Sequence, residues 1–126
     1  MSRRRSSTSW IPRVLGAATA AYSVAIIAKP ELFARPTKLA SDREEIPRGT
    51  AIGIRALGGR DLASGLAMVC APAGTPLRTA VAVRVASDVV DLVLLGTSLP
   101  DRQARTTAAA AAGGWGALCA LGFWAA

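Results

Sequence analysis

The chain has no histidine among its 126 residues. Histidine is the usual acid–base group near neutral pH, a common zinc ligand and the familiar haem ligand, so sites of these kinds are not expected. Cysteine is also scarce, since Cys70 and Cys119 stand alone without C-x-x-C spacing. We therefore predict no metal site and no cofactor. We interpret both cysteines as small packing residues in apolar helices, with a structural disulfide as the alternative.

Aromatic residues make up only 5% of a chain that is 52% hydrophobic. Alanine, valine and leucine therefore supply the apolar character, whereas a soluble core of this size usually gains much of its buried area from aromatic side chains. The length allows one domain at most. The abundance of alanine, glycine and arginine fits a high-GC bacterial genome.

Four long apolar segments predict four helices, at residues 10–28, 50–71, 77–99 and 106–126. The first is long enough to cross roughly 30 Å of hydrocarbon at about 1.5 Å per residue. Proline punctuates a predicted loop at 29–49, and residues 101–105 are predicted to form a small charged loop. Residues 72–76 form a turn short enough to fold the second and third helices into an antiparallel hairpin. The expected fold is an all-α, antiparallel bundle of four transmembrane helices.

Two alternatives to this membrane topology remain open. A soluble four-helix bundle is disfavoured because the fourth segment carries no charge from Thr106 onward and has no polar face for water. A cleaved signal peptide would explain the first segment, with Ser23-Val24-Ala25 as a small-x-small site. The apolar run continues past that site, which favours a retained helix.

The amino end is basic, with Arg3, Arg4, Arg5 and Arg13 and no nearby acid. Such a flank beside an apolar segment is typical of a cytoplasmic end that contacts anionic lipid. Nucleic acid is not an expected partner, because no aromatic interleaving or recognition motif follows. We predict a disordered arm at residues 1–9, a cytoplasmic N-terminus and a multi-pass protein of the plasma membrane.

The third segment carries charge on one face. Arg84, Asp88 and Asp91 are spaced i, i+4, i+7 and fall within a stripe roughly 60° wide. Charged side chains inside hydrocarbon are rare and usually face the bundle interior. This stripe is therefore expected to face a neighbouring helix.

The second segment offers a matching face. Gly58, Asp61 and Gly65 share one side of this helix, with Arg55 at its edge. The glycines are expected to let the third helix come close.

Folding the hairpin at its turn brings charges to the same depth. Arg55 should lie near Asp91, and Asp61 should lie near Arg84 and Asp88. Both pairings join opposite charges, so the spacing predicts an ion-pair network between the two helices.

Arg60 does not fit this network, because in a regular helix it points roughly opposite to Gly58. Two interpretations remain open. A kink at Gly58-Gly59 would swing Arg60 toward Asp88. Otherwise Arg60 keeps its own face and binds an anionic lipid head group, carboxylate or phosphate.

The charge balance of the network decides which residues are candidates for function. The net charge is zero if all six side chains meet, that is Arg55, Arg60 and Arg84 with Asp61, Asp88 and Asp91. Without Arg60, the network keeps one extra negative charge, which favours a protonated aspartate. The candidate catalytic residues are Asp88, Asp91 and Asp61. The candidate ligand-binding residues are Arg60, Arg55 and Arg84.

Three functions follow from these features, and whether the protein is an enzyme is left open. The first is a small accessory or interaction subunit, held in lipid and associating with itself or with a partner membrane protein through faces such as Gly49/Gly53 and Ala109/Gly113. The second is an intramembrane acid–base isomerase or cyclase acting on an apolar or lipid-like substrate, which requires a cavity between the second and third helices. The third is a small proton-coupled transporter, with Trp115 or Trp124 lining a cation path.

The run Gly58-x-Arg60-Asp61-Leu62-x-x-Gly65, followed by Arg84-x-x-x-Asp88-x-x-Asp91, resembles an uncharacterised family of small four-helix bacterial membrane proteins. The similarity covers roughly residues 11–126, and the Gly-x-Arg-Asp-Leu-x-x-Gly motif carries most of it. This resemblance implies the four-helix membrane fold. It implies no activity, substrate or cofactor.

Overall fold

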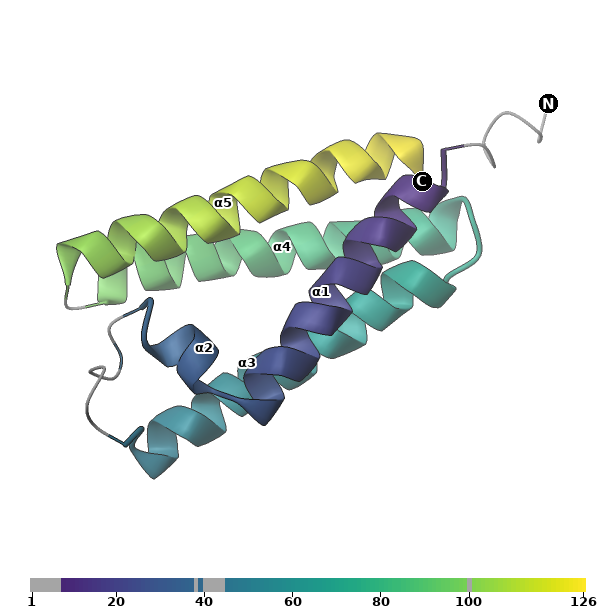
Figure 1. Ribbon diagram of the computed structural model, residues 1–126. Helices are drawn as coiled ribbons and strands as arrows, with labels where there is room; N and C mark the ends of the chain where they lie inside the picture. Colours follow the sequence, from purple (N-terminus) through teal and green to yellow (C-terminus); the bar gives the residue numbers. More distant parts are fainter. Residues whose placement is uncertain (1–7, 38, 40–44, 100) are drawn as a thin grey trace.

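The computed structural model describes residues 8–37, 39, 45–99 and 101–126. Within these residues the structure is all-α, with no strand (Figure 1). Its helices are α1 (Trp10–Ala28), α2 (Glu31–Ala34), α3 (Arg48–Cys70), α4 (Thr75–Ser98) and α5 (Arg102–Ala125). The all-α class and the four long helices agree with the prediction. Most of the predicted basic arm lies outside the described residues.

The helix boundaries were predicted well at α1 and less well at α5. The predicted loop at 101–105 is wrong, because α5 already begins at Arg102. Asp101 caps this helix, and its carboxylate accepts hydrogen bonds from the backbone N–H groups of Gln103 (2.7 Å) and Ala104 (3.0 Å). An aspartate cap satisfies N–H groups that the first helical turn leaves unpaired, which allows the charged residues after it to be helical.

The predicted loop at 29–49 contains the short helix α2. Pro30 precedes its first turn, and the Thr37 hydroxyl donates to the Phe33 carbonyl (2.7 Å) just beyond it. The fully buried Ala34 packs with Ile26 of α1 and Ile54 of α3. This apolar contact holds α2 against the first and third helices, where it closes one side of the site described below.

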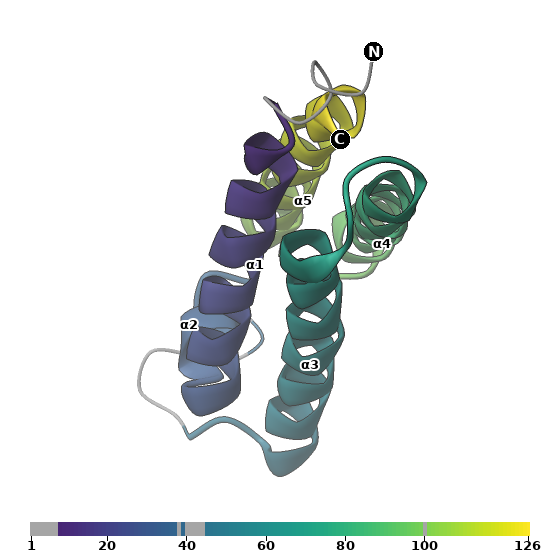
Figure 2. The ribbon, with the colours of Figure 1, turned by 90° about the vertical axis from the view of Figure 1, so that its right-hand side faces the viewer.

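The long helices associate as two antiparallel pairs, α1 with α3 and α4 with α5. The contact between α3 and α4 is much less extensive. The pairs approach each other at the end that holds the start of α1, the end of α5 and the 71–74 turn, and they diverge toward the end near α2 (Figures 1 and 2). The predicted close packing of the second helix on the third is therefore wrong.

Glycine positions explain this choice of partner. A Cβ atom built on Gly16 would lie 2.6 Å from the carbonyl oxygen of Gly65, and one built on Gly65 would lie 2.7 Å from the carbonyl oxygen of Gly16. Similarly, a Cβ on Gly58 would lie 2.8 Å from Cγ1 of Ile27. Gly58 and Gly65 thus let α1 approach α3, and they do not face α4 as predicted.

The predicted small-residue pairs differ in their surroundings. Gly49 and Gly53 face open space, so this pair makes no contact within the described structure. Ala109 and Gly113 instead face α4, where their neighbours are Gly96 and Leu92 respectively. The second pair therefore helps to pack α5 on α4.

The two cysteines are free, so the disulfide alternative is wrong. Cys119 is buried and packs with Met68 and Val81, as expected of a small packing residue. Cys70 is exposed at the end of α3, so the packing interpretation does not hold for it.

The chain buries a charged side chain and exposes large apolar ones. Arg84 is the largest fully buried side chain, at 1% exposure, whereas Val83 and Val93 of the same helix are more than half exposed. On α5, Leu121 and Trp124 are 69% and 80% exposed. A buried arginine needs paired charges, and exposed apolar residues in such number suggest a surface that contacts a partner or lipid.

Two helices, α1 and α5, are long and apolar enough to cross a membrane by length and composition. Only 28% of the apolar window of α1 and 22% of that of α5 is buried within the chain. The core helix of a soluble protein would be mostly buried. Most of both apolar windows is not buried within the chain, and this is a weak indication of membrane association.

The glycine crossing predicts a stability difference between two matched alanine variants. Gly16→Ala should lower the free energy of unfolding by about 1–3 kcal/mol, because the new methyl group would overlap a backbone carbonyl that cannot move freely. Gly53→Ala should have no cost and should gain up to about 1 kcal/mol of helix propensity, since its Cβ meets open space. Thermal or denaturant unfolding of the two variants in detergent measures both effects. Equal stabilities would contradict the close α1–α3 crossing.

Candidate functional site

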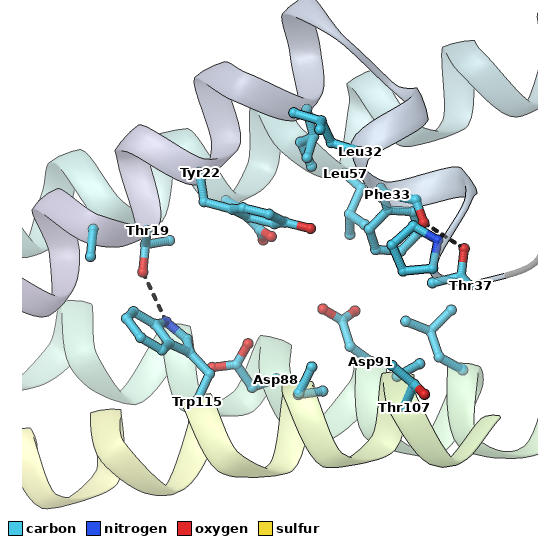
Figure 3. Close-up of a pocket in the computed structure, with 18 of the residues that line it drawn as sticks. Thr19, Tyr22, Leu32, Phe33, Thr37, Leu57, Asp88, Asp91, Thr107 and Trp115 are labelled. Carbon is cyan, nitrogen blue, oxygen red and sulfur yellow. Dashed lines mark hydrogen bonds between the residues drawn. The ribbon is translucent and has the colours of Figure 1, made fainter. Parts of the chain in front are cut away.

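A cavity of about 480 Å³ lies between the α1–α3 pair and the α4–α5 pair, with α2 on one side (Figure 3). Its volume is within the range of sites that bind small molecules. Most of its wall is apolar and comes from all five helices. Its charged lining groups, Asp61, Arg84, Asp88 and Asp91, come from α3 and α4.

Arg84 joins α3 to α4 at the wall of this cavity. Its Nη1 donates to Oδ1 of Asp61 (2.8 Å) and to the Ser64 hydroxyl (3.0 Å) on α3. Its Nε and Nη2 donate to the two carboxylate oxygens of Asp88, one turn along α4. The predicted pairing of Asp61 with Arg84 is confirmed. Asp88, by contrast, pairs with an arginine of its own helix.

Arg60 forms the second connection between α3 and α4. It contacts Asp91 through both terminal nitrogens, Nη1 to Oδ1 (3.1 Å) and Nη2 to Oδ2 (2.7 Å). Its Nε (3.1 Å) and Nη2 (2.9 Å) also donate to Oδ1 of Asp61. The α3 helix is continuous through Gly58-Gly59, so the predicted kink toward Asp88 is wrong. The side chain of Arg60 is long enough to reach Asp91 of α4 without a kink in α3.

The guanidinium of Arg60 is therefore occupied by two aspartates. This also contradicts the alternative in which Arg60 keeps a separate face for an anionic ligand. Its side chain remains 38% exposed, at the outer edge of the network, and it does not line the cavity.

Arg55 lies apart from the other charges. Its Nε donates to the backbone carbonyl of Ile27 (3.1 Å), in the last turn of α1. Carbonyl groups in the last turn of a helix lack an intrahelical partner and carry the negative end of the helix dipole, so a guanidinium is stabilised there. The predicted Arg55–Asp91 pair is wrong because α3 packs on α1, which gives Arg55 this nearer acceptor.

The ion-pair network, formed by Arg60, Asp61, Arg84, Asp88 and Asp91, is not neutral. It contains two guanidinium groups and three carboxylates, joined by four ion pairs. With Arg55 elsewhere, the balance is one negative charge. Among the described residues, no other charged side chain lines the cavity.

Aromatic and hydroxyl groups complete the wall of the cavity. Trp115 of α5 donates its indole N–H to the Thr19 hydroxyl of α1 (2.9 Å), which connects the two helix pairs across the cavity. Tyr22 extends from α1 into the same space (Figure 3). Sequence reasoning placed Trp115 on a path for cations but missed Thr19 and Tyr22. Their only sequence signal is the presence of polar side chains within an apolar helix.

Gly116 of α5 packs directly against the side chain of Asp88. A Cβ atom on Gly116 would lie 3.0 Å from Cβ of Asp88, so α5 approaches α4 closely at this point. The aspartate is thereby buried at 5% exposure although it borders the cavity.

Comparison of the chain with protein-family models, curated proteins and solved structures finds no match. The resemblance to small four-helix bacterial membrane proteins therefore stays a prediction, and the candidate site is defined by its geometry alone.

The network predicts unequal effects for two arginine substitutions. Arg84→Met should lower the free energy of unfolding by about 3–5 kcal/mol, because it leaves the buried Asp88 and the half-buried Asp61 without their shared partner. Arg55→Met should cost less than about 1 kcal/mol, since Arg55 is exposed and makes a single contact. Unfolding in detergent compares the variants directly. Similar losses in both would mean that Arg84 does not connect the two helix pairs.

Proposed function

We propose that this chain is an integral membrane protein whose four long helices cross the bilayer. We further propose that its cavity binds a small, mostly apolar molecule between the helices. The observation that carries the proposal is a cavity of about 480 Å³ with convergent charged groups, inside a chain whose exposed surface is largely apolar.

The proposal requires that α3 and α4 also cross the bilayer, although their charges lower their hydropathy. Both are long enough, at 23 and 24 residues. Their central charges Asp61, Arg84 and Asp88 turn inward and pair with one another, which greatly reduces the cost of placing them at membrane depth. Exposed apolar residues such as Val83 and Val93 remain for contact with lipid.

Four crossings would place the start of α1, the end of α5 and the 71–74 turn on the same side, and these three lie at one end of the fold (Figure 1). The basic flank of α1 favours the cytoplasmic side for this end. The opposite end, with α2 and the α4–α5 connection, would face outward.

Cysteine labelling tests this topology. In a Cys70→Ser, Cys119→Ala background, Leu39→Cys should react with a membrane-impermeant maleimide added to intact cells. Ala73→Cys should react only after the membrane is opened, because it lies in the turn on the cytoplasmic side. Labelling of both positions in intact cells would contradict four crossings with the N-terminus inside.

Binding of a ligand explains the cavity better than the alternative functions do. An accessory subunit without a ligand gives no reason for a cavity lined by charge. An acid–base enzyme needs a carboxyl group that can reach its substrate, but both oxygens of Asp88 and both oxygens of Asp91 are engaged by a guanidinium group. We therefore favour binding over catalysis.

A cavity-filling pair of variants tests ligand binding. Ala112→Phe should reduce the affinity of the purified protein for the neutral probe triphenylmethanol by about tenfold or more, because Ala112 lines the cavity and the ring would occupy it. Ala110→Phe is the matched control, since Ala110 is an exposed residue of the same helix and does not line the cavity. Calorimetric titration in detergent provides the measurement. Equal binding by both variants would place the probe elsewhere.

A further inference from the structure

We propose that the ligand of this cavity is a lipophilic cation, such as a hydrophobic amine or a quaternary ammonium compound. This inference rests on the proposed function, since it names the class of molecule that the same cavity binds. The observations that carry it are the charge of the lining, the one oxygen of its three carboxylates that has no donor among the described residues, and the aromatic wall.

The charge of the lining has the sign that a cation requires. Three carboxylates and the guanidinium of Arg84 border the cavity. Arg60 lies outside the lining, at the outer edge of the network. Arg60 compensates one of the two surplus negative charges and leaves the other. In surroundings of low dielectric constant, one unpaired negative charge attracts a cation strongly and repels an anion.

Among the three carboxylates that line the cavity, Asp61 has spare capacity to accept a hydrogen bond. Its Oδ1 accepts hydrogen bonds from both Arg60 and Arg84. Within the described part of the chain, no donor lies within hydrogen-bond distance of its Oδ2. Asp88 and Asp91, by comparison, have both oxygens engaged by arginine. Asp61 borders the cavity, so a cation there meets a carboxylate that still has accepting capacity.

The remaining wall suits the body of such a molecule. Tyr22, Phe33 and Trp115 supply aromatic rings from three different helices around the space (Figure 3). Aromatic faces attract cations, and this attraction is stronger where water is excluded. The other lining side chains are mostly aliphatic, among them Ile26, which fits an apolar body and not a hydrated metal ion.

Three probes of similar shape and different charge test the inference by calorimetric titration of the purified full chain in a neutral detergent. Tetraphenylphosphonium should bind more tightly than neutral triphenylmethanol by about tenfold or more, and tetraphenylborate should bind more weakly than both. If tetraphenylborate binds as well as the cation, the inference is overturned. Binding of triphenylmethanol that is equal to that of the cation overturns it while leaving the proposed apolar site intact. Absence of binding by all three would overturn both.

Two charge variants should change cation affinity in opposite directions. Asp91→Asn removes the surplus negative charge and should weaken tetraphenylphosphonium binding by about tenfold, whereas Arg60→Gln adds to it and should strengthen binding by a similar factor. Arg60→Gln combined with Asp91→Asn restores the original balance and should restore the affinity. Arg60→Gln should change triphenylmethanol binding only slightly, because Arg60 does not line the cavity.

The two variants are expected to change cation affinity in opposite directions. This difference distinguishes recognition of charge from damage to the fold. Both single substitutions break the same Arg60–Asp91 ion pair, so a purely structural role for this pair would weaken binding in both. Circular dichroism and gel filtration in detergent establish which variants are folded. If Asp91→Asn does not fold, Arg60→Gln still decides: tighter cation binding supports the inference, and unchanged or weaker binding overturns it.

Discussion

The structure depends on a buried arginine that holds two helix pairs together. Arg84 lies on α4, is almost completely buried, and contacts Asp61 of α3 and Asp88 of its own helix. A buried guanidinium is tolerated only when nearly all of its donors find acceptors, because its desolvation is costly. This requirement fixes the register of α3 against α4 although the two helices share little packed surface.

Close packing and charge pairing occur at different interfaces. Glycines at the α1–α3 crossing bring those backbones together, and small residues on α5 do the same against α4. Between the pairs, an apolar cluster of Met68, Val81 and Cys119 makes contact near the 71–74 turn. Around the cavity, the contact is made by long charged side chains and by the Trp115–Thr19 hydrogen bond. Long side chains keep backbones apart, and the space that remains is the cavity. The network therefore both joins the two halves and borders the volume between them.

The same arrangement accounts for the unusual surface. Because the polar groups of α3 and α4 turn toward each other, the outward faces of these helices are left to valine, leucine and isoleucine. An apolar exterior around a charged interior is stable where lipid replaces water, since charge is then stabilised only by other charge. Arg55 and Arg60 of α3 are exceptions, because both remain exposed, Arg60 at 38% beside the aspartates that it binds.

The sequence alone determined the helical class, the positions of the long helices within a few residues, and the pairing of Asp61 with Arg84. These features depend on local periodicity and on the short 72–76 turn. Only the tertiary structure decided that Gly58 and Gly65 face α1, that Arg55 is drawn to a carbonyl of that helix, and that Arg60 takes its place beside Asp91. Helical spacing gives the direction of a side chain from its own axis but not the neighbour that lies there. That neighbour is chosen by shape complementarity between helices far apart in sequence, and the cavity follows from that choice.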